Sequence, residues 1–318
     1  MKKIFKLIII TIMIFSVVSL TGCNINKKEN NKLTIISTSF PGYDFARAVT
    51  KNNKNVEVKM LLKPGAEMHS YEPTPQDIKE IKQSKMFIYV GGDSDEWIDD
   101  VLEDIDVNST KVIKLMDLVN TVEEEHVEGM EAEEEEEESE EKVEYDEHVW
   151  TSPKNAIEIT KKLKEEIIKI DSSSKDLYES NTNSYVSKLN DIDSKIKDIV
   201  KNAKRKTLVF GDRFPLRYFV DEYNLSYYAA FPGCSEQTEA SSKTISFLIK
   251  KVKEENIPVV FHIELSNGKI AETISKETKT KVLEFKTGHN ISQKDFDAGV
   301  TFVDIMNDNI ENLKVALN

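Results

Sequence analysis

The sequence predicts an α/β protein with two lobes, each with a central mainly parallel sheet flanked by helices, joined by one long rigid helix. In residues 33–118, and again in 206–318, short apolar runs alternate with longer segments of helical periodicity. Such alternation is typical of parallel sheets with crossover helices. Between these stretches, residues 174–204 contain neither glycine nor proline and repeat apolar residues at helical spacing, which predicts the joining helix.

The first lobe follows from the order of apolar and amphipathic segments. Apolar runs such as LTIISTSF and MFIYVGG favour buried strands, whereas QDIKEIKQS has the periodicity of a helix facing a core. In chain order we expect strands at 33–40, 56–62, 86–92 and 111–117, and helices at 43–50, 76–84 and 97–105.

An acidic segment, residues 121–147, follows the first lobe's strands and helices. It holds 16 acids and one lysine, whereas the whole chain has a formal charge of -14, so the remainder carries a net charge of +1. Dense like charge with hardly an aromatic predicts a disordered loop. No basic stripe stands out in the remainder, which argues against a nucleic-acid partner.

Helical signals resume directly after His148. Ser152 is a plausible N-cap with Pro153 at the first helical position, and apolar residues then recur at helical spacing to Ile170. In the second lobe we expect strands at 207–211, 226–231, 257–265 and 281–285, and helices at 214–224, 243–256, 268–279 and 293–317.

The N-terminus predicts export. Lysines precede an apolar run from Ile8 to Leu20 that is too short to span a bilayer comfortably, and small residues follow. The sequence LTGC resembles the bacterial lipobox, which implies cleavage before Cys23 and lipidation of its sulfur. The predicted divisions are a signal peptide (1–22), a tether (23–32), a first lobe (33–172) that includes the acidic segment, a linking helix (173–205) and a second lobe (206–318).

Three of the five histidines fall between predicted elements. His69 lies in a loop after the second strand, His148 lies between the acidic segment and a helix, and His289 follows the last strand of the second lobe. Ligands of open α/β sheets bind beyond the carboxyl ends of strands. Imidazole is the commonest ligand of late divalent metals, so together these histidines indicate a metal site.

Several motifs resemble those of the metal-binding lipoproteins of zinc and manganese ABC importers, the cluster A-I family. They are GAEMHSYEPTPQD, DEHVWTSPKNAIEI and the strand VVFHIE followed by AETISKET. The resemblance covers essentially the whole mature chain. It implies two lobes bridged by a rigid helix, with one metal ion in the cleft held by two ligands from each lobe.

The resemblance assigns His69 and His148 as first-lobe ligands. Zinc-type members usually carry a third histidine at the end of the second lobe's first strand, where this chain has Gly211. We therefore expect His289 and Cys234 to complete a His3Cys set suited to zinc. Asp212 and Glu236 stay open as alternatives to Cys234, and carboxylates would favour manganese. Glu264 matches a family glutamate that is not usually a ligand.

The predicted function is an extracytoplasmic, lipid-anchored binding protein at the cell membrane, not an enzyme. The resemblance implies that it captures zinc, or alternatively manganese, and delivers it to an ABC permease with its ATPase; we expect a monomer. A secreted zinc hydrolase is the enzyme alternative, but the sequence contains no HExxH. A surface adhesin with a structural metal is a third class. In addition, the acidic segment is hypothesised to raise the cation concentration near His148.

Overall fold

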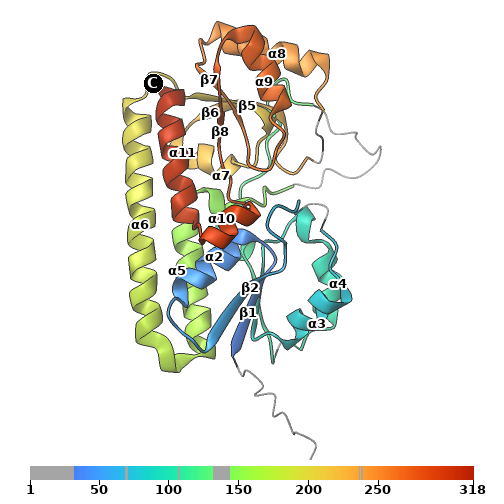
Figure 1. The fold of residues 1–318 in the computed structure, drawn as a ribbon, viewed down its shortest axis with the longest axis vertical. Coiled ribbons are helices and arrows are strands. Elements are labelled where there is room, and N and C mark those ends of the chain that lie inside the picture. Colours follow the sequence, from blue (N-terminus) through green and yellow to red (C-terminus); the bar gives the residue numbers. More distant parts are fainter. Residues whose placement is uncertain (1–31, 69–70, 107, 132–143, 236, 238) are drawn as a thin grey trace, which may run out of the picture. The chain divides into compact units, whose positions relative to one another are not determined.

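The computed structural model describes residues 32–68, 71–106, 108–131, 144–235, 237 and 239–318 (Figure 1). Residues 33–318 form one compact unit with two four-stranded parallel sheets, in the orders β2-β1-β3-β4 and β6-β5-β7-β8. The predicted α/β fold with two sheet-containing lobes and a long joining helix is thereby confirmed. The predicted signal peptide and Cys23 lie outside the described residues. Within those ranges, no helix is long and apolar enough to cross a membrane.

The first sheet is covered by helices on both faces. Its strands are β1 (Leu33–Ser37), β2 (Val56–Met60), β3 (Met86–Tyr89) and β4 (Lys111–Lys114). The connections contain α2 (Phe40–Val49), α3 (Pro75–Gln83), η1 (Asp93–Asp95), α4 (Trp97–Glu103) and η2 (Met116–Leu118). Ile35 belongs to the core cluster that includes α2, whereas Ile36 packs with residues of α3 and α4. Burial of both faces explains why the strand reads as an unbroken apolar run.

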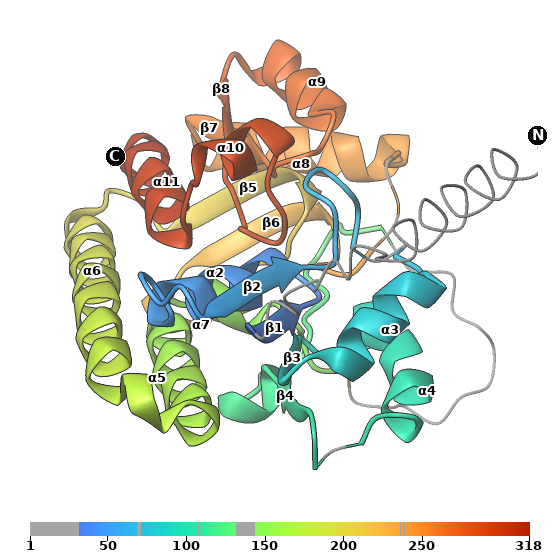
Figure 2. The same cartoon turned by 60° about the horizontal axis from the view of Figure 1, so that its bottom comes forward.

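The segment after His148 builds the joining helices. A short turn, η3 (Val149–Thr151), leads into α5 (Pro153–Ile170), and η4 (Ser172–Ser174) leads into the 28-residue α6 (Lys175–Asn202). The hydroxyl of Ser152 accepts a hydrogen bond from the backbone N–H of Asn155, as an N-cap does. Figures 1 and 2 show α6 running beside both α5 and the C-terminal helix.

The second sheet repeats the parallel arrangement. Its strands are β5 (Thr207–Arg213), β6 (Ser226–Phe231), β7 (Val259–His262) and β8 (Lys281–Glu284). Its helices are α7 (Arg217–Tyr223), α8 (Ser242–Glu254), α9 (Lys269–Thr278), α10 (Gln293–Ala298) and α11 (Phe302–Leu317). The β5–β6 register shifts between Phe210 and Arg213, at the carboxyl end of β5.

The prediction of one helix over 293–317 is wrong, because the chain breaks after α10. Gly299 has a φ of +73°, a left-handed conformation that ends a helix and that glycine adopts without strain. Thr301 then caps α11, with Asp304 bonded back to the Thr301 backbone N–H.

The two ends of the acidic segment are also ordered, contrary to the prediction of disorder throughout. Asp146 donates its backbone N–H to the Val122 carbonyl oxygen, and Glu123 forms a bridge with Tyr145. Farther along, Glu131 donates its backbone N–H to the carbonyl oxygen of Ala230, on the edge strand β6. Backbone hydrogen bonds to other segments of this chain thus outweigh charge repulsion at these ends. Residues 132–143 lie outside the described residues.

Candidate metal centre

His148 is fully buried and is oriented by Asp146. The Asp146 Oδ1 accepts the backbone N–H of His148 at 2.8 Å and lies 3.2 Å from its ring Nδ1. Burial alone lowers the pKa of His148, but the carboxylates of Asp146, Glu147 and Glu124 outweigh it and raise the pKa. With Nδ1 engaged by Asp146, Nε2 is the nitrogen that could bind a metal, an arrangement common among metal-binding histidines.

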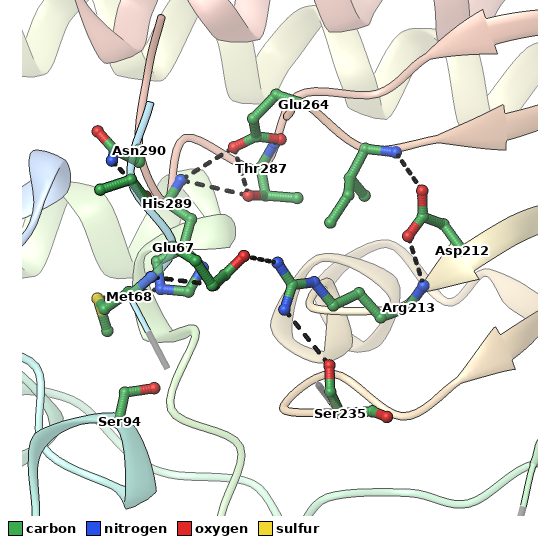
Figure 3. A network of polar contacts seen from close by, with 12 residues as sticks. Glu67, Met68, Ser94, Asp212, Arg213, Ser235, Glu264, Thr287, His289 and Asn290 are labelled. Atoms are coloured by element: carbon green, nitrogen blue, oxygen red, sulfur yellow. Dashed lines mark hydrogen bonds and ion pairs between the residues drawn. The ribbon is translucent and has the colours of Figure 1, made fainter. Parts of the chain in front are cut away.

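His289 is held by residues of the second lobe. Its backbone N–H lies 3.2 Å from both Glu264 Oε1 and Thr287 Oγ1, and the carboxylate of Glu264 also accepts both donors of Thr287 (Figure 3). Glu264 therefore fixes the loop after β8 that carries His289. The resemblance implies that this glutamate is not usually a ligand, and here its carboxylate is hydrogen-bonded to that loop.

The two histidines meet across the lobes. Their ring centroids are 5.1 Å apart with planes at 88°, and His289 has an exposed fraction of 8%. Trp150 packs against both rings and donates its indole N–H to the Thr287 carbonyl oxygen at 3.0 Å. Side chains from η3 and from the loop after β8 thus enclose one buried centre.

Glu147 joins the histidines at this centre. One potential ligand atom from each of Glu147, His148 and His289 lies within 4.8 Å of the others, and all three residues are buried. Ser94 donates both its backbone N–H and its hydroxyl to the Glu147 carboxylate. Gly92, with a φ of +89°, makes room for that carboxylate, since a Cβ there would lie 2.6 Å from Oε2. Two imidazoles and a carboxylate form a donor set that zinc accepts.

Sequence reasoning did not identify Glu147 as a ligand candidate, because it stands in an acidic run that reads as solvated. Glu147 differs from a solvated acidic residue in being buried and in accepting two hydrogen bonds from Ser94. Burial raises the pKa of its carboxyl to about 7. In the sequence, only its position directly before His148 could have indicated a role of Glu147 at the metal site.

Loops of the two lobes are hydrogen-bonded beside the centre. The side-chain amide of Asn290 donates to the carbonyl oxygens of Lys63 at 2.9 Å and Ala66 at 2.7 Å, and Gly65 donates its backbone N–H to Ile291. These bonds fix the segment that leads to Met68, whose Sδ is 3.1 Å from His289 Nε2.

The structure brings together two of the four predicted ligands, His148 and His289. His69 and the alternative Glu236 lie outside the described residues. Cys234 is not part of the Glu147, His148 and His289 group, which was found among the described residues. Its thiol has a raised pKa, first through burial and then through nearby carboxylates that include Glu147 and Glu124.

Asp212 and Arg213 organise the end of β5. The carboxylate of Asp212 accepts the backbone N–H groups of Arg213 and Ile263, so it fastens β5 to the strand end of β7. The guanidinium of Arg213 contacts Glu67 Oε2 at 2.5 Å and donates to the Ser235 carbonyl oxygen (Figure 3). Arg213, at the end of β5, therefore links the first-lobe loop to the second-lobe loop that follows β6.

Gly211 has no space for a side chain. A Cβ at this position would lie 2.5 Å from the backbone nitrogen of Ala271 and 2.6 Å from its Cα, both in α9. Where zinc-type family members usually carry a histidine, this chain has a glycine, and α9 packs closely against β5 there.

Comparison with protein families matches residues 35–316 to the family described as zinc-uptake complex component A, periplasmic. The high-affinity zinc uptake system protein ZnuA of Bacillus subtilis is 30% identical over 295 residues, which cover 91% of this chain and 89% of that protein. The zinc-binding lipoprotein AdcA of Streptococcus pneumoniae is 28% identical over 99% of this chain. The chain spans 61% of the length of AdcA.

Solved structures resemble the fold over most of the chain. The metal-dependent lipoprotein YcdH of Bacillus subtilis aligns with a TM-score of 0.75 and 26% identity, over 90% of this chain and 99% of that one. The Zn(II)-bound ZnuA-like domain of Streptococcus pneumoniae AdcA aligns with a TM-score of 0.73 and 25% identity, again over 90% and 99%.

Proposed function

The chain belongs to the zinc-uptake complex component A family, and from this premise we propose that it captures zinc outside the cytoplasm and delivers it to an ABC permease. The observation that carries the proposal is the meeting of His148 and His289, one from each lobe, in a buried centre. An ion bound by both would hold the lobes together and would be released when they separate.

The proposed ligands are His148 and His289 with His69, which the family resemblance assigns. For the fourth position, the location of Glu147 favours its carboxylate over the thiol of Cys234. A set of three histidines and one carboxylate suits zinc, and manganese is the alternative if carboxylates dominate the coordination. The His3Cys set stays a prediction that a variant at Cys234 tests.

Competitive zinc and manganese titration tests the proposed ligands. Because residues 33–318 form one compact unit, the protein from residue 24 onward can be used. We expect tighter binding of zinc than of manganese, loss of at least about tenfold in zinc affinity for His148→Ala and His289→Ala, and a smaller loss for Glu147→Gln. His126→Ala, an exposed histidine in the acidic segment, is the matched control.

Equal affinities for the two metals, or unchanged zinc binding in both histidine variants, would contradict the proposal. A loss of zinc preference in Cys234→Ser but not in Glu147→Gln would support Cys234, and not Glu147, as the fourth ligand. Binding of zinc without any effect on its uptake would instead favour the adhesin or the hydrolase alternative.

The proposed cellular context is a lipid-anchored monomer that works with an ABC permease and its ATPase. Cells that lack this protein should take up less zinc at limiting supply, and the wild-type gene should restore uptake. Cys23→Ala, expected to lose the anchor, should release protein from the membrane fraction. Retention of that variant in the membrane would contradict the lipid anchor.

A further inference from the structure

Met68 places a sulfur atom at the centre between the lobes. The side chain has an exposed fraction of 3%, and its Sδ is 3.1 Å from Nε2 of His289 (Figure 3). Asn290, the neighbour of His289, holds the Met68 loop by a 2.7 Å hydrogen bond to the Ala66 carbonyl oxygen. The loop that carries the sulfur is thus hydrogen-bonded to the residue next to the histidine.

The spacing suits two ligands of one ion. With metal–sulfur and metal–nitrogen bonds of about 2.3 Å and about 2.1 Å, tetrahedral donors lie about 3.6 Å apart, so a shift of about 0.5 Å would place Sδ and Nε2 on one ion. The thioether is neutral and soft, needs no deprotonation, and is preferred by ions such as Cu(I).

We propose that Met68 donates its thioether sulfur to the ion bound by His289, so that the centre takes soft cations of the Cu(I) and Cd(II) class as well as zinc. The inference rests on the proposed binding function of the same site. Glu147 offers a hard oxygen and Met68 a soft sulfur beside the histidines, so the fourth donor changes with the ion. This pair of donors disfavours Mn(II) at the Met68 side.

Packing alone accounts less well for the position of Met68. Its side chain belongs to the large core cluster, where a methionine commonly fills gaps. However, a packing role places no requirement on the sulfur, whereas here the sulfur itself contacts the ring nitrogen that a metal would use. Leucine would fill nearly the same volume without a donor atom, which makes Met68→Leu an informative variant.

The test compares Met68→Leu with wild type and with Met116→Leu, a buried methionine of the same lobe. Cu(I) is titrated anaerobically against a colorimetric chelator, and Cd(II) and zinc are titrated by competition. We expect Met68→Leu to lose about tenfold or more in Cu(I) and Cd(II) affinity while zinc affinity changes by less than about threefold. Met116→Leu should match wild type.

Unchanged Cu(I) and Cd(II) affinities in Met68→Leu would overturn the inference and leave zinc binding by the histidines intact. Failure of wild type to bind zinc would overturn the proposed function instead. X-ray absorption of selenomethionine protein loaded with Cu(I) keeps the test independent of folding in the variant. A selenium neighbour at about 2.4 Å from copper is expected, and its absence would contradict the proposal.

Discussion

The imidazole rings of His148 and His289 lie edge to face, with centroids 5.1 Å apart, although the residues are 141 positions apart in the chain. Each is fixed by its own lobe: Asp146 orients the first, and Glu264 holds the loop of the second. Because neither lobe supplies both rings, metal affinity should depend on how the lobes are held together.

Restoring a histidine at Gly211 should not improve zinc binding. The clash with the Ala271 backbone begins at Cβ, so Gly211→Ala and Gly211→His should each destabilise the protein by about 1–3 kcal/mol. Urea unfolding of both variants, with zinc titration of the folded protein, checks the expectation. A stable Gly211→His protein with tighter zinc binding would contradict this expectation. It would show that α9 moves to make room and that a histidine at position 211 can bind zinc.

Arg213→Ala should speed zinc release. Arg213 and Glu67, which form an ion pair, both line two cavities. One cavity, of about 440 Å³, lies at the end of β5, and a small one, of about 20 Å³, lies beside His289. Loss of a partly exposed pair costs about 1 kcal/mol, which corresponds to about a fivefold faster dissociation. Stopped-flow release into a chelator measures this rate, with Arg205→Ala as control. Identical rates in all three proteins would show that the Arg213–Glu67 pair does not slow zinc release.

Asp44→Ala should destabilise the whole fold. This carboxylate, 1% exposed, accepts hydrogen bonds from the Tyr185 hydroxyl at 2.6 Å and the Phe302 backbone N–H at 2.9 Å, and it pairs with Arg47. It therefore joins α2, α6 and α11. Its removal leaves buried donors unsatisfied at a cost of about 3 kcal/mol.

The matched control for Asp44 is Asp191→Ala. Asp191 is exposed on α6 and pairs with Lys195, so its loss should change the free energy of unfolding by less than about 0.5 kcal/mol. Equal denaturation midpoints for the two variants would contradict the structural role of Asp44.

Two deletions separate the structural and electrostatic roles of the acidic segment. Removing 123–144 also removes Glu124, which accepts the Gly233 backbone N–H, and Glu131, which binds β6, so this variant should be less stable. Removing only 132–143 should preserve stability but slow zinc association several-fold at low salt, with little effect near 1 M salt. Stopped-flow association rates at both salt concentrations check this; equal rates at low salt would reject the hypothesis of local cation enrichment.

The sequence predicted the fold well because alternation of buried strands and amphipathic helices is a local pattern. The long helix α6 could be recognised from its spacing and its lack of glycine and proline alone. The break at Gly299 was missed although its signals were present: glycine, then a threonine with an aspartate three residues later. Helical periodicity on both sides of the break dominated the interpretation.

The centre could be predicted only in part. Loop position and residue type selected His148 and His289, but the roles of Glu147, Met68 and Gly211 depend on contacts with distant parts of the chain. Glu147 is buried by Ser94 and Gly92 of the β3–α4 connection, and the space at Gly211 is filled by α9. Such contacts leave no periodic trace in the sequence.

We infer that one zinc ion bridges His148 and His289. Anomalous diffraction at the zinc edge, from crystals of the zinc-loaded protein, tests it most directly. We expect a single strong peak in the anomalous map, within about 2.0–2.1 Å of a ring nitrogen of each histidine. A peak bound by one lobe alone, or at a position away from both rings, would contradict it.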